Sequence, residues 1–63
     1  MDKDELAALK ELQAERNAAR NELRKACQVY LDGKTGPNTL LQLAQIEHEL
    51  IMQIVMTYGY EHI

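Results

Sequence analysis

Residues 40–58, LLQLAQIEHELIMQIVMTY, are the stretch that most constrains how this chain can fold. On a helix that turns about 100° per residue, the polar side chains of this stretch fall in one narrow band and the rest of the circumference is apolar. The band holds Gln42, Gln45, Glu49 and Gln53. A helix that packs on a single neighbour needs an apolar stripe of only ~100°. This segment therefore needs two neighbours.

The apolar arc divides into two flanks, with Leu40 and Glu47 near the line between them. One flank holds Leu43, Ile46, Leu50 and Ile54, and the other holds Leu41, Ala44, Ile51, Met52 and Val55. The chain of 63 residues offers only one other long segment, so we expect the second neighbour to be another molecule. A chain this short commonly needs a disulfide, a metal or an oligomer for stability. Its one cysteine, Cys27, cannot form an internal disulfide.

Self-association is therefore expected, and its simplest form is a two-fold homodimer that makes a four-helix bundle. The pattern leaves open which apolar flank faces the same chain. The predicted oligomer interface consists of Leu40, Leu41, Ala44, Glu47, Ile51, Met52 and Val55.

Residues 3–32 are predicted to form the first helix, because helix-forming residues dominate and no glycine or proline interrupts them. Asp2, with Glu5 three positions later, has the pattern of a capping box. The apolar stripe of this helix has heptad-like spacing, with Arg16 at one of the heptad positions. The stripe holds Leu9, Leu12, Ala19, Leu23, Ala26 and Tyr30, with Leu6 and Cys27 at its edge. We expect Cys27 to be a small core residue.

Residues 33–37 form the predicted loop between the helices. Gly33 is expected to end the first helix in a left-handed conformation. Either Thr35 or Asn38 is expected to cap the second helix. A loop this short makes the two helices antiparallel neighbours.

The second helix is predicted over 38–58, where Gly59 ends it. The remaining tail, 59–63, is expected to be frayed. The fold class is thus all-α, with a single antiparallel two-helix hairpin domain over 1–63.

The charges of the first helix are segregated on the two sides of its apolar stripe. One side carries Lys3, Lys10, Arg20, Arg24 and Lys25 with Asn17 and Asn21, and the opposite side carries Glu11, Glu15 and Glu22. The candidate binding face on the basic side, which we call the basic flank, consists of Lys10, Asn17, Arg20, Asn21 and Arg24. The second helix has no lysine or arginine. We expect Glu47, which lies in apolar surface, to pair with an arginine. The candidates are Arg20 or Arg24 of the same hairpin and Arg16 across the oligomer.

No group of residues carries recognisable catalytic chemistry. His48 and Glu49 begin like an HExxH zinc motif, but Met52 occupies the position of the second histidine. The GKTG segment lacks the spacing of a phosphate-binding loop. We therefore expect no enzyme activity, no cofactor and no metal.

The composition is typical of a cytoplasmic protein. The first residues are charged and lack the apolar core of a signal peptide. Polar residues interrupt 40–58 before an apolar run reaches the ~18 residues of a membrane span. The net charge of −3 gives no general attraction for nucleic acid or for anionic membranes.

A dimeric hairpin of two long helices resembles, in length and layout over the whole chain, the Rop family of plasmid copy-number regulators. This resemblance implies RNA binding through one exposed helix face, at the positions of Lys10, Asn17, Asn21 and Arg24. The small size, the acidic charge and the lack of catalytic chemistry are also similar in type to accessory proteins of phages and plasmids, such as early proteins of lambdoid phages.

The leading functional interpretation is a small, non-catalytic regulatory protein of phage or plasmid type: a homo-oligomeric helical bundle that binds and modulates another, unidentified protein. Its expected surfaces are elongated, charged helix faces, which suit a partner of opposite charge better than a small molecule. The alternative is a hairpin that binds RNA or DNA through the basic flank.

Overall fold

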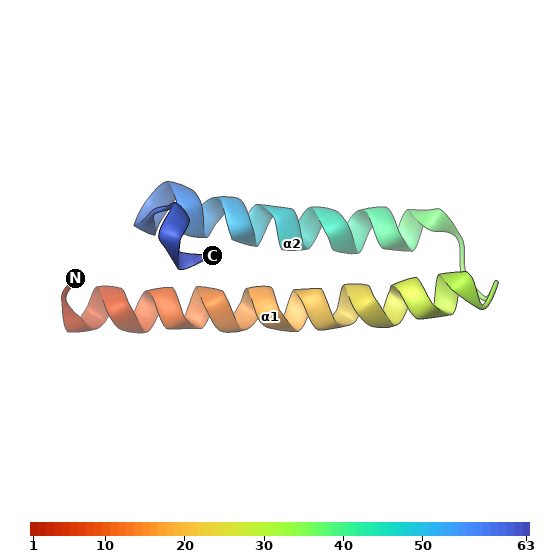
Figure 1. Ribbon diagram of the computed structural model, residues 1–63, viewed down its shortest axis with the longest axis horizontal. Coiled ribbons are helices and arrows are strands. Elements are labelled where there is room, and N and C mark those ends of the chain that lie inside the picture. The colour runs from red at the N-terminus through yellow and green to blue at the C-terminus, as the bar shows by residue number, and fades with distance from the viewer.

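The chain folds into two long α-helices that lie side by side and run in opposite directions (Figure 1). The computed structural model describes all 63 residues. Helix α1 spans Lys3–Leu31, α2 spans Pro37–Tyr58, and η1, a single turn of 3-10 helix, spans Tyr60–His62. The molecule is elongated, measuring 47 × 16 × 14 Å. The predicted all-α antiparallel hairpin is confirmed, and the helix bounds differ from the predicted ones by at most one residue.

Both ends of α1 are closed by the residues that the sequence predicted. At the start, an Asp2 carboxylate oxygen accepts a hydrogen bond of 2.8 Å from the backbone N–H of Glu5. At the end, Gly33 adopts a left-handed φ of 76°. Its N–H donates to the Tyr30 carbonyl at 2.9 Å, and the N–H of Lys34 donates to the Val29 carbonyl at 3.1 Å. This pair of bonds is the Schellman motif, which satisfies carbonyls that would otherwise lack partners.

The start of α2 differs from the prediction. Gly36 is the N-cap residue and Pro37 is the first helical residue, so neither Thr35 nor Asn38 caps this helix. Proline suits the first position because its ring fixes φ near the helical value and its missing N–H would have no intrahelical acceptor there. The proline therefore determines where α2 begins, in place of a side-chain cap.

The contact between α1 and α2 is a seam whose central side chains are three or four residues apart, with further half-buried side chains beside them. On α1 the buried and half-buried residues are Leu9, Leu12, Gln13, Arg16, Ala19, Leu23 and Ala26. On α2 they are Leu40, Leu43, Glu47, Leu50, Ile51, Ile54, Val55 and Tyr58. Only Leu9 and Ile54 are fully buried, at 3% and 0% exposed. The hairpin therefore has a seam but almost no enclosed core.

The predictions that Cys27 lies in the core and that Tyr30 lies in the apolar stripe are wrong, because both residues are exposed. A heptad repeat drifts by about 20° per heptad on a straight helix. Cys27 lies on the same straight line along the surface of α1 as Leu9, but the seam drifts away from this line along the helix. At the level of Cys27 the side chain that faces α2 is therefore Ala26. Tyr30 lies in the last turn of α1, at the level where α2 is only beginning.

On α2, the side chains that face α1 are three members of one apolar flank together with the two residues near the line between the flanks. We call this set the covered stripe, and it consists of Leu40, Leu43, Glu47, Leu50 and Ile54. Ile46, which shares a flank with Leu43 and Leu50, is turned to the side and is 48% exposed.

The C-terminal tail, which was expected to be frayed, forms the single turn η1 over Tyr60–His62. Gly59 ends α2 with a φ of 108°, which an L side chain rarely adopts. The following turn, η1, packs against α2. It is tied to α1 by Gln13, whose side-chain Nε2 donates a hydrogen bond of 2.9 Å to the His62 carbonyl.

Candidate interaction face

A second stripe of side chains runs along α2 and faces solvent for most of its length. We call it the free stripe, and it consists of Leu41, Ala44, His48, Met52 and Val55. Leu41 is 67% exposed and Met52 is 40% exposed. Ala44 and His48 are also exposed, and Val55 is half-buried. The helical period places the free stripe about 100° around α2 from the covered stripe.

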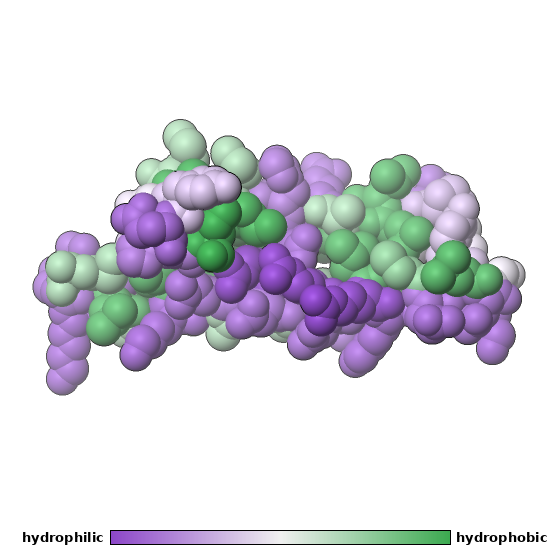
Figure 2. Space-filling view, in the orientation of Figure 1, coloured by the Kyte–Doolittle hydropathy of each residue, from purple (hydrophilic) through white to green (hydrophobic).

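The exposed apolar surface is visible in the space-filling view. Figure 2 shows hydrophobic side chains gathered in two patches, one over the N-terminal half of α2 and one where α2 meets the C-terminal tail, with hydrophilic side chains between the patches and along most of α1. An exposed apolar surface of this kind on a small protein commonly marks a site of interaction.

The structure divides the predicted oligomer interface into two groups. Leu40 and Glu47 belong to the covered stripe and are half-buried within the hairpin. Of the other members, Leu41, Ala44 and Met52 are exposed, whereas Ile51 and Val55 are half-buried within the hairpin. The surface that a second molecule can reach is therefore centred on the free stripe.

Glu47 forms the ion pair that the sequence predicted, and its partner is Arg20 of the same hairpin. Arg20 Nε donates to a Glu47 carboxylate oxygen at 3.0 Å. The Glu47 side chain is 18% exposed and the Arg20 side chain is 44% exposed. Because Arg20 remains in contact with water, the pair is expected to stabilise the hairpin by no more than ~1 kcal/mol. The main effect of the pair is that the Glu47 carboxylate, which lies in the seam, has a cationic partner.

Arg16 is the second charged residue in the seam, and it has no carboxylate partner. Its Nη2 donates to Asn17 Oδ1 at 3.1 Å. Its Nε is buried and makes no hydrogen bond. The predicted pairing of Arg16 with Glu47 across an oligomer involves two chains, so the structure of one chain does not test it. Within the hairpin, the partner of Glu47 is Arg20.

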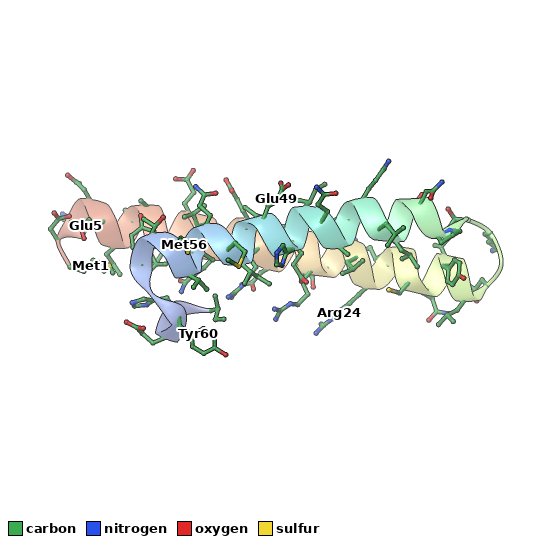
Figure 3. All side chains as sticks on the ribbon, turned by 90° about the horizontal axis from the view of Figure 1, so that it is seen from above. Met1, Glu5, Arg24, Glu49, Met56 and Tyr60 are labelled. Atoms are coloured by element: carbon green, nitrogen blue, oxygen red, sulfur yellow. The ribbon has the colours of Figure 1, made fainter.

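The basic flank lies on the same side of the hairpin as the free stripe. Arg20 crosses to Glu47 from this side of α1, and the next residue along α2 is His48 of the free stripe. Figure 3 shows Arg24 and Tyr60 extending to one side of the hairpin and Glu49 extending to the other. All five members of the basic flank are exposed: Lys10, Asn17, Arg20, Asn21 and Arg24. Lys10 and Arg24 form no salt bridge.

The opposite side of the hairpin is acidic. We call Glu11, Glu15 and Glu22 the acidic face, because the helical period places all three on this side of α1. A shallow groove of about 400 Å³ runs beside it, lined by Ala8, Glu11, Leu12, Glu15, Gln53 and Tyr58. Glu22 lies 3.7 Å from the Lys25 ammonium, whereas Glu11 and Glu15 form no salt bridge. The groove thus offers two unpaired carboxylates beside the apolar side chain of Leu12.

No three histidine, cysteine, aspartate or glutamate side chains lie close enough together to hold a metal ion. Neither helix combines the length and the apolar character needed to cross a membrane. The chain matches no protein-family model, and no curated protein or solved structure matches it significantly. The surfaces described above are therefore the basis for a functional proposal.

Proposed function

We propose that this protein is a small, non-catalytic regulatory protein of the cytoplasm that self-associates through α2 and binds and modulates another protein. The observation that carries the proposal is the free stripe, an apolar line on a hairpin that fully buries only Leu9 and Ile54. Small domains with so little enclosed core commonly gain stability by self-association. The short hairpin layout favours the class of small phage- and plasmid-encoded regulators.

The acidic face is the surface that we assign to the protein partner. Glu11 and Glu15 are exposed, make no ion pair, and stand beside the groove over Leu12. A partner segment with lysine or arginine next to an apolar side chain would complement this arrangement, because opposite charges steer and select partners while apolar contact adds affinity. The groove lies on the side of the hairpin away from the free stripe, so both surfaces can be occupied together.

The protein-binding proposal is tested with two matched baits in a lysate of cells that express the protein naturally. The first bait carries Glu11→Gln and Glu15→Gln, and the second carries Lys10→Gln and Arg24→Gln. All four side chains are exposed, so both baits are expected to keep the wild-type helix content. We expect a protein that binds the wild-type and the basic-flank bait and is depleted about tenfold, ~1.4 kcal/mol, on the acidic-face bait. Equal recovery of every bound protein on both baits would contradict the assignment.

A second candidate function is the binding of RNA or DNA by the basic flank. The observation that favours it is the exposure of Lys10 and Arg24, neither of which has a carboxylate partner. Under this hypothesis, Lys10→Ala and Arg24→Ala weaken binding for all nucleic-acid sequences. Each substitution also lowers the slope of log affinity against log salt concentration by about one unit per lost phosphate contact. Glu11→Gln with Glu15→Gln serves as the control, and it should leave this slope unchanged.

A further inference from the structure

We infer that a second copy of this chain covers the free stripe, with α2 packed antiparallel on the partner's α2 and the two-fold axis passing beside His48. This inference rests on the self-association in the proposed function and specifies its geometry. The structure contains the surface that this arrangement requires, and the chain's own side chains determine its register.

The free stripe is complementary to itself when it is turned end to end. Its members follow one another at intervals of three, four, four and three residues, so the pattern is symmetric about His48. A two-fold axis at His48 places Leu41 opposite the partner's Val55 and Ala44 opposite the partner's Met52. The small Ala44 side chain leaves room for the long and flexible Met52 side chain, which adapts well to irregular gaps. A long side chain thus meets a small one at each of the two contacts between Ala44 and Met52, and leucine meets valine at both ends.

Two other arrangements of the same surface fit less well. In a parallel pair, each side chain would meet its own copy, so Met52 would crowd Met52 while Ala44 left a gap. The free stripe could also pack on the basic flank of the partner's α1. Its apolar side chains would then remove Lys10 and Arg24 of that flank from water without giving either one an acidic partner. The antiparallel contact between two copies of α2 brings together surfaces that contain no charged member.

The hairpin exposes enough surface for a dimer interface along the free stripe. The accessible surface is 4739 Å² for a chain of 7.2 kDa. A compact folded monomer of this mass is expected to expose about 4,100 Å². The difference of roughly 600 Å² per chain reflects the elongated shape of the hairpin. A dimer that buried this excess in both chains, about 1,200 Å², would have an interface at the lower end of the area that stable protein interfaces bury.

His48 gives the contact a fixed register. A neutral imidazole has one donor and one acceptor, so two imidazoles that face each other across the axis can form one hydrogen bond. Any sliding of one α2 along the other would place the imidazole against an apolar side chain such as Met52 and leave its polar atoms without partners. A single polar residue within an apolar helix contact specifies alignment in this way in coiled coils.

Disulfide trapping tests this geometry directly. In a Cys27→Ser background, single cysteines replace His48, Leu41 or Val55, and each protein is oxidised gently and run on a non-reducing gel. Only residues near a two-fold axis meet their own copies, and a disulfide requires Cα atoms within ~7 Å. Leu41 and Val55 each stand seven residues from His48, so each would lie about 21 Å along the helices from its own copy.

We expect His48→Cys to give mainly covalent dimer, and Leu41→Cys or Val55→Cys alone to give monomer. An equimolar mixture of Leu41→Cys and Val55→Cys should cross-link. A mixture of Ala44→Cys with Met52→Cys should cross-link as well, which keeps the test decisive if replacing His48 alters the dimer. Self-cross-linking of both Leu41→Cys and Val55→Cys would overturn the antiparallel register in favour of a parallel one.

Sedimentation of the uncross-linked proteins separates the two levels of the proposal. A protein that sediments as a dimer but cross-links at none of these positions would overturn the inferred geometry and leave the proposed self-association standing. A protein that sediments as a monomer would overturn both. Circular dichroism of each cysteine variant checks that the hairpin has formed.

Discussion

The two stripes of α2 are alike in sequence and differ in what covers them. Each follows the heptad-like spacing of a helix contact, and each has one polar residue near its centre, Glu47 in the covered stripe and His48 in the free stripe. The covered stripe meets α1, and Glu47 has Arg20 as its partner. The free stripe meets solvent, and His48 is exposed. The comparison shows that the spacing of apolar residues predicts that a surface will be covered, while the number of helices in the chain decides whether the chain can cover it.

Truncation in the covered stripe should have the largest effect on stability. Ile54→Ala removes a side chain that is 0% exposed, and such substitutions cost roughly 2–5 kcal/mol because a cavity remains. The free energy of unfolding, measured by urea denaturation at one fixed protein concentration, gives this value. The matched control is Ile46→Ala on the same helix, where the side chain is 48% exposed and the loss should be clearly smaller. Equal losses at the two positions would mean that the covered stripe is not the main contact.

A charge in the free stripe should affect association far more than the folding of each hairpin. Leu41→Glu and Met52→Glu place a carboxylate in the inferred interface, and we expect either to raise the dimer dissociation constant at least tenfold, ~1.4 kcal/mol. These two positions give a cleaner test than Ile51 or Val55, which are half-buried in the hairpin. Gln42→Glu, an exposed site in the polar band, adds the same charge to the same helix and should leave association nearly unchanged.

The ion pair in the covered stripe should give a smaller effect. In a double-mutant cycle with Glu47→Leu and Arg20→Ala, we expect a coupling free energy of at most ~1 kcal/mol, because Arg20 is 44% exposed and water screens the pair. The same cycle with Arg24→Ala should give no coupling, since Arg24 forms no salt bridge. Coupling of Glu47 with Arg24 instead of Arg20 would show that the side chains pair differently in solution.

The smallest predicted effect concerns the polar residue of the free stripe. His48→Leu removes polar atoms from the inferred contact, so we expect the dimer to become tighter, by at most about tenfold. Register should become less specific at the same time, because the polar residue no longer fixes the alignment. Sedimentation measures the first effect, and cross-linking of Leu41→Cys with Val55→Cys in the His48→Leu background measures the second. A weaker dimer would contradict the placement of His48 within the contact.

Much of the fold could be predicted from local rules in the sequence. Asp2, Gly33 and Gly59 act within one turn of the chain, and each ends or begins a helix as predicted. One local prediction failed, because Pro37 determines the start of α2 in place of a side-chain cap from Thr35 or Asn38. The other predictions that failed depend on geometry over longer distances. Cys27 leaves the seam through a drift that accumulates along α1, and the position of η1 depends on Gln13, which is 49 residues away from His62 in the chain.

The candidate site could be predicted only in part. The doubled apolar arc of α2 indicated that two neighbours were needed, but it did not indicate which line would face α1. The structure assigns Leu40 and Glu47 to the intrachain contact and leaves Leu41 and Met52 exposed. That choice depends on how α1 and α2 rotate about their axes when they pack, and the apolar pattern is too broad to specify this rotation. No pattern in the sequence predicts that the Nε atom of Arg16 is buried without a hydrogen-bond partner.

Our main proposal is that another copy of the chain covers the free stripe. Sedimentation velocity of the unmodified protein at tens to hundreds of micromolar tests it most directly. We expect a species of twice the 7.2 kDa chain mass that dissociates on dilution. Leu41→Glu should abolish this species while the circular dichroism spectrum remains that of a helical hairpin. A monomer over the whole concentration range, or a dimer that Leu41→Glu leaves intact, would contradict this proposal.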